Sequence, residues 1–261
     1  MLPRPMTTAP PTARPPSRPA TLHAAVRSAL ADVPLVGVVR TASRDEAARR
    51  ARLFRDGGVR LIEITFTVPG ATELVGELLA EREEAEAGGE AAPSHLVGMG
   101  TVTTPERAGQ ALAAGAEFVV TPNASPRVAE IVRAAGVFLV VGALTPTEIV
   151  EAREIGADLV KVFPAPTAGG PAYLRAVRGP LGDVPMLASG GFGPEEIPAY
   201  REAGAEAFGI GDPLLGKSDE ESLRRIAGAV ALARARGEGP AESPEGGQRE
   251  DAREDAREDA R

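Results

Sequence analysis

A lysine and a glutamate lie in two short apolar runs, where a charged side chain needs an explanation. Lys161 is in the run 159–163 (LVKVF), which ends at Pro164, and Glu63 is in the run 61–65 (LIEIT). The chain has 29 Lys+Arg, and Lys161 is one of only two lysines, the other being Lys217. An amine can lose its proton and attack a carbonyl, whereas a guanidinium does not, so the choice of lysine here indicates nucleophilic chemistry.

This pair of residues predicts a Schiff-base site. An isolated lysine in an apolar interior is costly as a cation, so burial favours the neutral amine, which forms a Schiff base with a ketone or aldehyde. Glu63 would be the general acid/base that moves protons during carbinolamine formation, dehydration and the carbon–carbon step. The alternative is a buried ion pair that only stabilises the fold, although such a pair is weak evidence for stability.

Alternating strand and helix patterns predict the fold that positions the pair. Strands are expected at 35–40, 60–65, 95–99, 117–121, 137–141, 158–163, 184–188 and 206–210. Helices are expected at 21–31, 43–56, 71–86, 104–114, 125–135, 145–155, 171–178, 193–203 and 219–236. Glycines such as Gly115 and Gly156 mark the joints, because glycine allows the left-handed cap that ends a helix. The pattern predicts an α/β fold, a single-domain (β/α)8 TIM barrel; the rival is an open doubly wound sheet, which the lack of Gly-x-Gly-x-x-Gly after the first strand weakens.

Strand parity predicts where the two charged side chains point. Successive side chains of a strand alternate between its faces, so the valines flanking Lys161 share one face and the isoleucines flanking Glu63 share one face. If these β-branched pairs pack against the helices, Lys161 and Glu63 both point into the barrel. Both lie near the carboxyl-terminal ends of their strands, where barrel enzymes place catalysis.

Three loops offer groups that bind anions. The run 189–191 (SGG) follows the seventh strand and precedes a helix, and backbone N–H groups at such a position bind phosphate in many barrels; a simple turn is the alternative. Thr101 follows the third strand and has a hydroxyl for a substrate carboxylate. Arg40, at the end of the first strand, is suited to a carboxylate or phosphate, with a pair to a loop carboxylate as the alternative.

The composition bounds the domain organisation. The 261 residues are 43% hydrophobic and 25% charged, which suits one globular domain, predicted at 21–236. A Pro/Arg-rich arm at 1–20 and a low-complexity charged tail at 237–261 are expected to be disordered, with a transit peptide as a minor alternative for the arm.

Charge and residue usage exclude several classes of function. A formal net charge of −8 argues against general nucleic-acid binding. With no cysteine and two histidines, a thiolate or multi-histidine metal site is excluded, while carboxylate sites stay open. No run reaches the roughly 18 apolar residues of a membrane span, and we expect a cytoplasmic protein that binds neither membrane nor nucleic acid.

Six motifs occur in an order that resembles one enzyme family. They are 61–69 (LIEITFTVP), 98–102 (GMGTV), 119–122 (VVTP), 142–148 (GALTPTE), 160–164 (VKVFP) and 189–191 (SGG). Over about residues 25–236 the chain resembles the class I aldolases for 2-keto-3-deoxy-6-phosphogluconate and 4-hydroxy-2-oxoglutarate. The resemblance implies a (β/α)8 barrel, a homotrimer, no metal or other cofactor, and cleavage of a 2-keto-4-hydroxy acid to pyruvate and an aldehyde.

The resemblance also implies roles for the matching residues. Lys161 would form the Schiff base, Glu63 would be the acid/base, and Thr101 would contact the pyruvate carboxylate. The pocket lining would include Pro122 and Phe163, and the phosphate would be held by Ser189, Gly190 and Gly191.

Departures from the family pattern concern substrate binding. Thr67 stands where some members have a carboxylate-binding arginine, which would shift that role toward Thr101 and Arg40, and Val141 precedes Gly142 where proline is usual. Gly211 and Asp212 follow the eighth strand, where the family usually has Gly-Ser and the serine binds phosphate. Because Asp212 brings a negative charge toward a dianion, either it turns away or the substrate is not phosphorylated.

The predicted function is that of a Schiff-base aldolase acting on a small-molecule 2-keto acid. Its candidate substrates are the phosphogluconate derivative, the galactonate counterpart, which 119–123 (VVTPN) weakly indicates, and 4-hydroxy-2-oxoglutarate. A metal-dependent barrel is a second class, disfavoured by the missing histidine cluster. A non-catalytic anion-binding barrel is a third, disfavoured by the presence of both Lys161 and Glu63.

Overall fold

The protein is described by a computed structural model over residues 18–89 and 95–235. The predicted C-terminal tail and most of the predicted N-terminal arm lie outside these ranges. The last three residues of that arm belong instead to the first helix, α1 (Arg18–Asp32).

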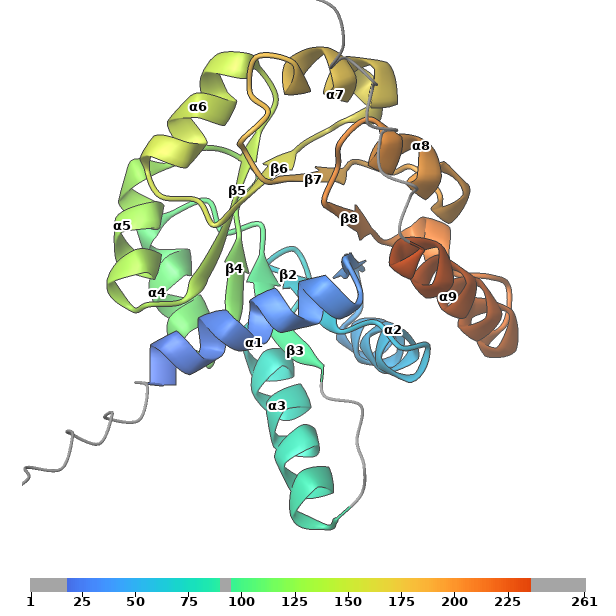
Figure 1. Cartoon of the computed structure of the whole chain (residues 1–261). Helices are drawn as coiled ribbons and strands as arrows, with labels where there is room; N and C mark the ends of the chain where they lie inside the picture. Colours follow the sequence, from blue (N-terminus) through green and yellow to red (C-terminus); the bar gives the residue numbers. More distant parts are fainter. Residues whose placement is uncertain (1–17, 90–94, 236–261) are drawn as a thin grey trace, which may run out of the picture.

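Parallel strands form a closed barrel in chain order from β1 to β8 (Figure 1), which confirms the predicted TIM barrel and excludes the open sheet. The strands are β1 (Leu35–Val39), β2 (Leu61–Thr65), β3 (Leu96–Gly100), β4 (Phe118–Val120), β5 (Phe138–Ala143), β6 (Leu159–Val162), β7 (Met186–Ser189) and β8 (Ala207–Ile210). Their ends lie within two residues of the predicted ends. The closing pair is β1 with β8, registered at Val36 and Gly209.

The outer layer consists of the helices between strands. They are α2 (Arg44–Asp56), α3 (Ala71–Ala87), α4 (Pro105–Ala113), α5 (Pro126–Ala134), α6 (Pro146–Glu154), α7 (Gly170–Arg178), α8 (Ile197–Glu202) and α9 (Asp219–Arg234). The predicted helix at 193–203 is split into a 3-10 turn, η2 (Pro194–Glu196), and α8; two further 3-10 turns are η1 (Pro166–Ala168) and η3 (Asp212–Leu214).

N-terminal capping residues define where helices begin, at the end of the barrel where the strands end. Thr104 and Thr145 accept hydrogen bonds from the backbone N–H three residues later, and each is followed by proline at the first helical position. At the other helix end, Gly115 and Gly156 have φ of 84° and 94°, the left-handed conformation predicted for the joints. The threonine caps thus define the loops after the strands, which surround the site, and the glycines define loops at the opposite end of the barrel.

Two hydrophobic layers confirm the predicted strand parity. The β-branched residues that flank Glu63 and Lys161 belong to the layer between strands and outer helices. Leu61, Leu159 and Leu187 belong to a second cluster, inside the barrel. Glu63 and Lys161 therefore face inward with the leucines of their own strands.

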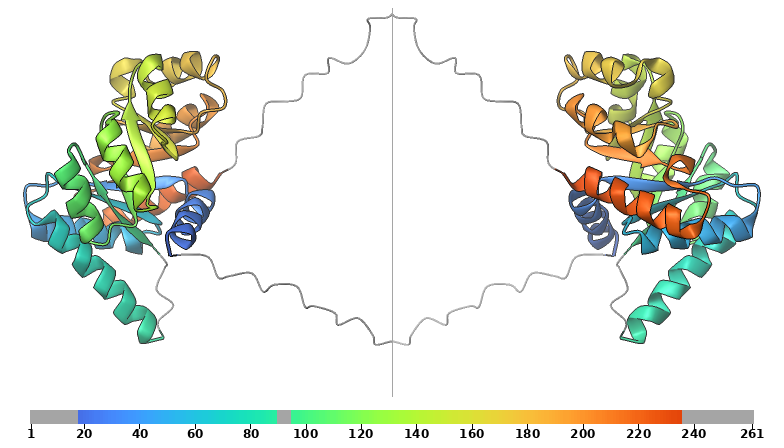
Figure 2. Two further views of the ribbon diagram at one scale, coloured as in Figure 1. Left: turned by 90° about the vertical axis from the view of Figure 1, so that its left-hand side faces the viewer. Right: turned by 90° about the vertical axis from the view of Figure 1, so that its right-hand side faces the viewer.

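Helix α1 covers the amino-terminal opening of the barrel (Figures 1 and 2). Its residues Val26 and Ala29 pack into the inner cluster. Asp158, just before β6, accepts a 3.1 Å hydrogen bond from Arg27 of α1, and the Arg27 guanidinium lies 5.5 Å from the ring centroid of Phe138. The interior is thus closed from below and is approached from the ends of the strands.

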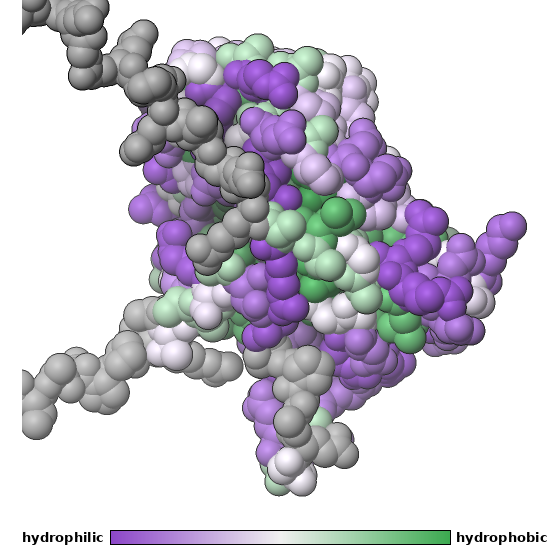
Figure 3. Space-filling model, turned by 45° about the vertical axis from the view of Figure 1, so that its right-hand side comes forward, coloured by the Kyte–Doolittle hydropathy of each residue, from purple (hydrophilic) through white to green (hydrophobic). Residues whose placement is uncertain are grey.

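Hydrophilic side chains cover much of the face in Figure 3, around an apolar area near its centre. The second half of α3 projects from the body of the barrel in both Figures 1 and 2. In the described ranges, no helix is both long enough and apolar enough to cross a membrane.

Candidate active site

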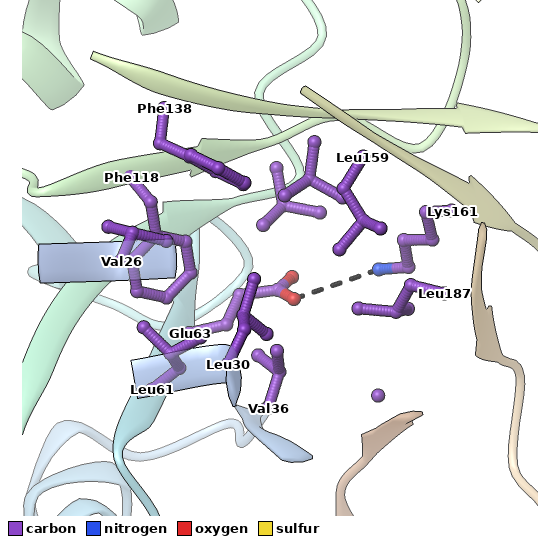
Figure 4. Close-up of a pocket in the computed structure, with 13 residues that line it drawn as sticks. Val26, Leu30, Val36, Leu61, Glu63, Phe118, Phe138, Leu159, Lys161 and Leu187 are labelled. Atoms are coloured by element: carbon purple, nitrogen blue, oxygen red, sulfur yellow. Dashed lines mark ion pairs between the residues drawn. The ribbon is translucent and has the colours of Figure 1, made fainter. Parts of the chain in front are cut away.

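Lys161 and Glu63 meet inside the barrel. The Lys161 Nζ atom lies 3.7 Å from Glu63 Oε2, and the two side chains are 8% and 2% exposed. Figure 4 shows them pointing toward one another from opposite sides of the cavity. The separation is too long for a good hydrogen bond, so the contact is an ion pair without one.

The Glu63 carboxylate does not use all of its hydrogen-bond acceptor capacity within the described part of the chain. Its Oε1 atom is buried and has no hydrogen-bond partner in the described part of the chain. A Cβ atom at Gly100 would lie 1.9 Å from that same oxygen, so only glycine at this position leaves room for the carboxylate. A buried carboxylate oxygen with unused acceptor capacity is costly for stability and suited to accepting a substrate proton.

The space beneath the pair is apolar and narrow. Leucine, valine and phenylalanine side chains line it together with Glu63 and Lys161 (Figure 4), and its water-accessible volume is about 10 Å³, room for about one water molecule. Val26 and Leu30 of α1 are part of this lining. Helix α1 was not predicted at the site, although the i, i+4 spacing of these two residues marks an apolar helix face.

Phe163 lies beside Lys161, and the backbone of Pro122 lies against Gly142 of the neighbouring strand β5. The Phe163 ring centroid lies 5.2 Å from Lys161 Nζ, within cation–π range. Gly142 is registered with Lys161 across the β5–β6 pair, and a Cβ there would lie 2.2 Å from the Pro122 carbonyl carbon. Glycine at 142 therefore permits the loop of Pro122 to lie directly against the strand that faces the lysine.

Arg40 and Thr101 are adjacent, as a shared anion site would require. The Arg40 guanidinium donates a 3.3 Å hydrogen bond to Thr101 Oγ1. Thr101 directly follows Gly100, the residue that touches the Glu63 carboxylate. The exposed Arg40 side chain directly follows the end of β1, so this pair lies at the carboxyl-terminal rim of the barrel and is not part of the cavity lining.

Thr67 is exposed, and its hydroxyl is engaged locally. Thr65 Oγ1 donates to the Val39 carbonyl at 2.9 Å and lies 2.7 Å from Thr67 Oγ1. Because a hydroxyl has one proton, Thr67 must be the donor in the second bond, which leaves it only as an acceptor toward a ligand. A carboxylate therefore gains no hydrogen bond from Thr67 in this arrangement, and its predicted role in substrate binding stays a prediction.

The loop after β7 lies against the loop after β6. Gly190 and Gly191 have φ of 137° and 100°, and a Cβ at Gly190 would lie 2.9 Å from the Cα of Pro164. Ser189 is buried, and its hydroxyl donates to the Gly209 carbonyl at 2.9 Å. The serine hydroxyl therefore joins β7 to β8, so anion binding here depends on the glycine backbone.

Asp212, after Gly211 at the end of β8, turns toward helix α2. Its Oδ1 atom lies 2.5 Å from Arg50 Nη1, and its side chain is 73% exposed. Arg50 is also held by Glu46 at 2.6 Å. Hydrogen bonds from Arg49, and secondarily from Arg50, lower the pKa of Glu46 from 4.5 to about 2 despite some desolvation. No sequence spacing identified Arg50 as the partner, since the two residues are 162 positions apart.

Within residues 18–89 and 95–235, no group of three or more His, Cys, Asp or Glu side chains is arranged to hold a metal ion.

The fold and the pair define a barrel with an amine and a carboxylate inside it, near the ends of its strands, where barrel enzymes do their chemistry. The family model for KDPG and KHG aldolases matches residues 26–228, and the chain belongs to this family. It is therefore an aldolase, a carbon–carbon lyase, and the predicted family is confirmed. The abbreviations stand for the phosphogluconate and hydroxyoxoglutarate substrates named above.

Individual relatives agree on the class of enzyme and differ in their named substrates. The chain is 36% identical to a 2-dehydro-3-deoxy-phosphogluconate aldolase of Treponema pallidum, over 66% of this chain and 77% of the relative. It is 30% identical to the 2-dehydro-3-deoxy-6-phosphogalactonate aldolase of Escherichia coli K12, over 77% and 95%. A solved structure of a 4-hydroxy-2-oxoglutarate/2-dehydro-3-deoxyphosphogluconate aldolase, 31% identical, covers 79% of this chain and 97% of its own with a TM-score of 0.67.

Proposed function

We propose that the protein cleaves a 2-keto-4-hydroxy acid to pyruvate and an aldehyde through a Schiff base on Lys161. The observation that carries this proposal is the buried Lys161–Glu63 pair, at 3.7 Å with the second glutamate oxygen unpartnered. A structural ion pair would saturate both oxygens, whereas this pair keeps an amine and a proton acceptor available for a ligand.

In the proposed mechanism each step is carried out by one of these two residues. The Lys161 amine adds to the substrate C2 carbonyl, and loss of water gives the protonated Schiff base. The Glu63 carboxylate takes the proton of the C4 hydroxyl as the C3–C4 bond breaks, the bonding electrons move into the enamine, and the aldehyde leaves. Glu63 then returns that proton to C3, and water releases pyruvate and restores the amine.

The proposal also gives substrate-binding roles to the surrounding residues. Arg40 and Thr101 at the rim would bind the carboxylate, while Phe163 and Pro122 would line the pocket. The aldehyde end would meet the loops of Ser189, Gly190, Gly191 and Gly211. No metal or organic cofactor takes part in these steps.

Reductive trapping tests the proposal. Incubation with pyruvate and borohydride should add one reduced pyruvate unit to Lys161, located by peptide mass spectrometry, and a Lys161→Arg variant should gain none. If the wild-type protein forms no adduct, the proposal fails and the anion-binding barrel takes its place. Full activity in EDTA would separate it from a metal-dependent aldolase.

We further propose that activity depends less on a substrate phosphate than in relatives named for phosphorylated substrates. Although Asp212 turns toward Arg50 of α2, it stands where the family usually has a phosphate-binding serine, so this position offers no hydroxyl donor and engages an arginine beside the loop. The ratio of kcat/KM for the phosphorylated six-carbon acid to that for 4-hydroxy-2-oxoglutarate tests this. A strong preference for the phosphorylated substrate would contradict it.

The galactonate derivative is the second candidate substrate. It is favoured by the 30% identity to the phosphogalactonate aldolase of E. coli, which this chain matches over 95% of the relative's length. Assay of both phosphorylated epimers in the same panel separates the two. A homotrimer stays a proposal from the family resemblance, tested by light scattering on the purified protein, and the cytoplasmic location stays a prediction.

A further inference from the structure

Thr101 holds a backbone conformation that its side chain disfavours. Its φ is 59°, and among the described residues it is the only non-glycine with a positive φ. A β-branched residue rarely adopts this region, and such strain persists only where surrounding contacts enforce it. The contacts that hold Thr101 in this conformation therefore indicate the function of the position.

Two arginines hold Thr101 from opposite ends. Arg40 donates to its Oγ1 atom at 3.3 Å, and Arg107 Nη1 donates to its carbonyl oxygen at 3.2 Å. Arg107 comes from the first turn of α4, and the same Nη1 atom donates to Thr103 Oγ1 at 3.0 Å. The carbonyl of the strained residue is therefore tied to the start of the following helix.

Arg107 is itself fixed from the neighbouring loop. Its guanidinium carbon lies 5.3 Å from the ring centroid of Phe66, the residue after β2. The Phe66 N–H donates to the Gly100 carbonyl at 2.9 Å, so both loops are joined next to the glycine that accommodates Glu63. Arg107 thus connects the loop of the acid/base strand to the loop of Thr101.

Helix α4 does not need this connection to begin. Thr104 already caps it by accepting from the Arg107 backbone N–H at 3.3 Å, and Pro105 occupies its first position. The Arg107 side chain therefore acts on the loop rather than on the helix start.

We propose that Arg107 is a positioning residue that holds Thr101 so that its hydroxyl faces the substrate carboxylate beside Arg40. This inference rests on the proposed pyruvate-forming activity, and it assigns the orientation of the carboxylate site to a residue outside the six family motifs. A Thr101 hydroxyl held in this way would supply the directional contact that Thr67, engaged with Thr65, does not offer.

The test measures pyruvate binding rather than overall stability. In Arg107→Gln, the pyruvate concentration that gives half-maximal borohydride trapping at Lys161 should rise about tenfold, the value of one hydrogen bond of ordinary strength. KM for 4-hydroxy-2-oxoglutarate should rise by a similar factor with kcat little changed, because Lys161 and Glu63 are untouched. Trapping of hydroxyacetone, a ketone without a carboxylate, should be unaltered.

Two controls make the result specific. Arg153→Gln removes another arginine that bonds to a loop carbonyl, that of Ala157 at 2.8 Å, and should leave trapping unchanged. Thr101→Gly accepts the positive φ without strain and lacks the hydroxyl, so adding Arg107→Gln to it should have little further effect.

The outcomes separate this inference from the proposed function. If the wild-type protein traps pyruvate and Arg107→Gln traps it equally well, the positioning role is overturned and the aldolase proposal stands. Equal losses for pyruvate and hydroxyacetone, or fully additive effects in the double variant, overturn the positioning role as well. If the wild-type protein traps nothing, both proposals fall together.

Discussion

Glu117 and Glu63 are both buried glutamates with a basic partner, but they differ in the hydrogen bonds that their oxygens accept. Glu117, just before β4, accepts hydrogen bonds from both terminal nitrogens of Arg82 at 2.8 and 3.0 Å and from the Val97 N–H at 2.8 Å. Glu63 has one ion-pair contact at 3.7 Å and an oxygen with no partner among the described residues. One carboxylate is fully used by the fold, and the other is kept available.

The two carboxylates therefore differ in what they contribute to the folded barrel. The hydrogen bonds to Glu117 link α3 and β3 to the start of β4, so they stabilise the folded protein. The Glu63 carboxylate joins little, and the glycine opposite it only makes space. A buried polar group left unsatisfied indicates a role in ligand chemistry, because the fold gains nothing from it.

Glu63→Gln gives the largest expected effect. The amide keeps the shape of the carboxylate but does not accept the C4 hydroxyl proton, so kcat should fall by roughly 10²- to 10⁴-fold. The free energy of unfolding should fall by less than in Glu117→Gln, because the 3.7 Å contact between Lys161 and Glu63 includes no hydrogen bond to lose. Steady-state kinetics and urea unfolding on the same preparation check both. A variant with nearly full kcat would show that Glu63 is only the ion-pair partner.

Glu117→Gln is the matched experiment on the structural pair. The Arg82 guanidinium is left buried without its charge partner, so the free energy of unfolding should fall by about 3 kcal/mol, measured by urea unfolding. At 25 °C the folded enzyme should keep its kcat. A large loss of kcat with unchanged stability would reverse the distinction between the two glutamates.

Asp212→Ser extends the comparison to an exposed pair at the rim. Because Asp212 is 73% exposed, loss of its pair with Arg50 should lower the free energy of unfolding by less than about 1 kcal/mol. Removing the negative charge should raise kcat/KM for the phosphorylated substrate about tenfold relative to 4-hydroxy-2-oxoglutarate. Asp219→Ser is the control, because it breaks the pair of Asp219 with Arg49, the residue next to Arg50 on α2. An unchanged substrate ratio would mean that Asp212 lies too far from the aldehyde end to matter.

The sequence predicted the barrel and the inward direction of its two charged residues because both follow from local rules. Strand parity predicted that Glu63 and Lys161 point into the barrel, and the glycine joints predicted the ends of helices. The partners of the loop residues do not follow from such rules. The pair of Arg50 with Asp212 and the hydrogen bond from Arg107 to the Thr101 carbonyl form only when the helices are packed on the barrel. The Thr67 hydroxyl must donate to Thr65 because Thr65 donates its own proton to a carbonyl at the end of another strand.

The smallest expected effect concerns Glu46, the half-buried carboxylate that pairs with Arg50. Its pKa in the folded protein is lowered to about 2 by Arg49 and Arg50, so its contribution to stability is present above its ordinary pKa of 4.5 and is lost as the pH falls toward 2. Glu46→Gln should therefore lower Tm slightly at pH 7, with a difference from wild type that shrinks between pH 4.5 and 2. Because the Glu46 side chain is 33% exposed and solvent screens its pairs, the effect at pH 7 should be about 1 kcal/mol or less. Thermal unfolding over this pH range is the measurement, with Glu130→Gln on α5 as the control. A difference that does not depend on pH would mean that Glu46 contributes through packing of its side chain and not through its charge.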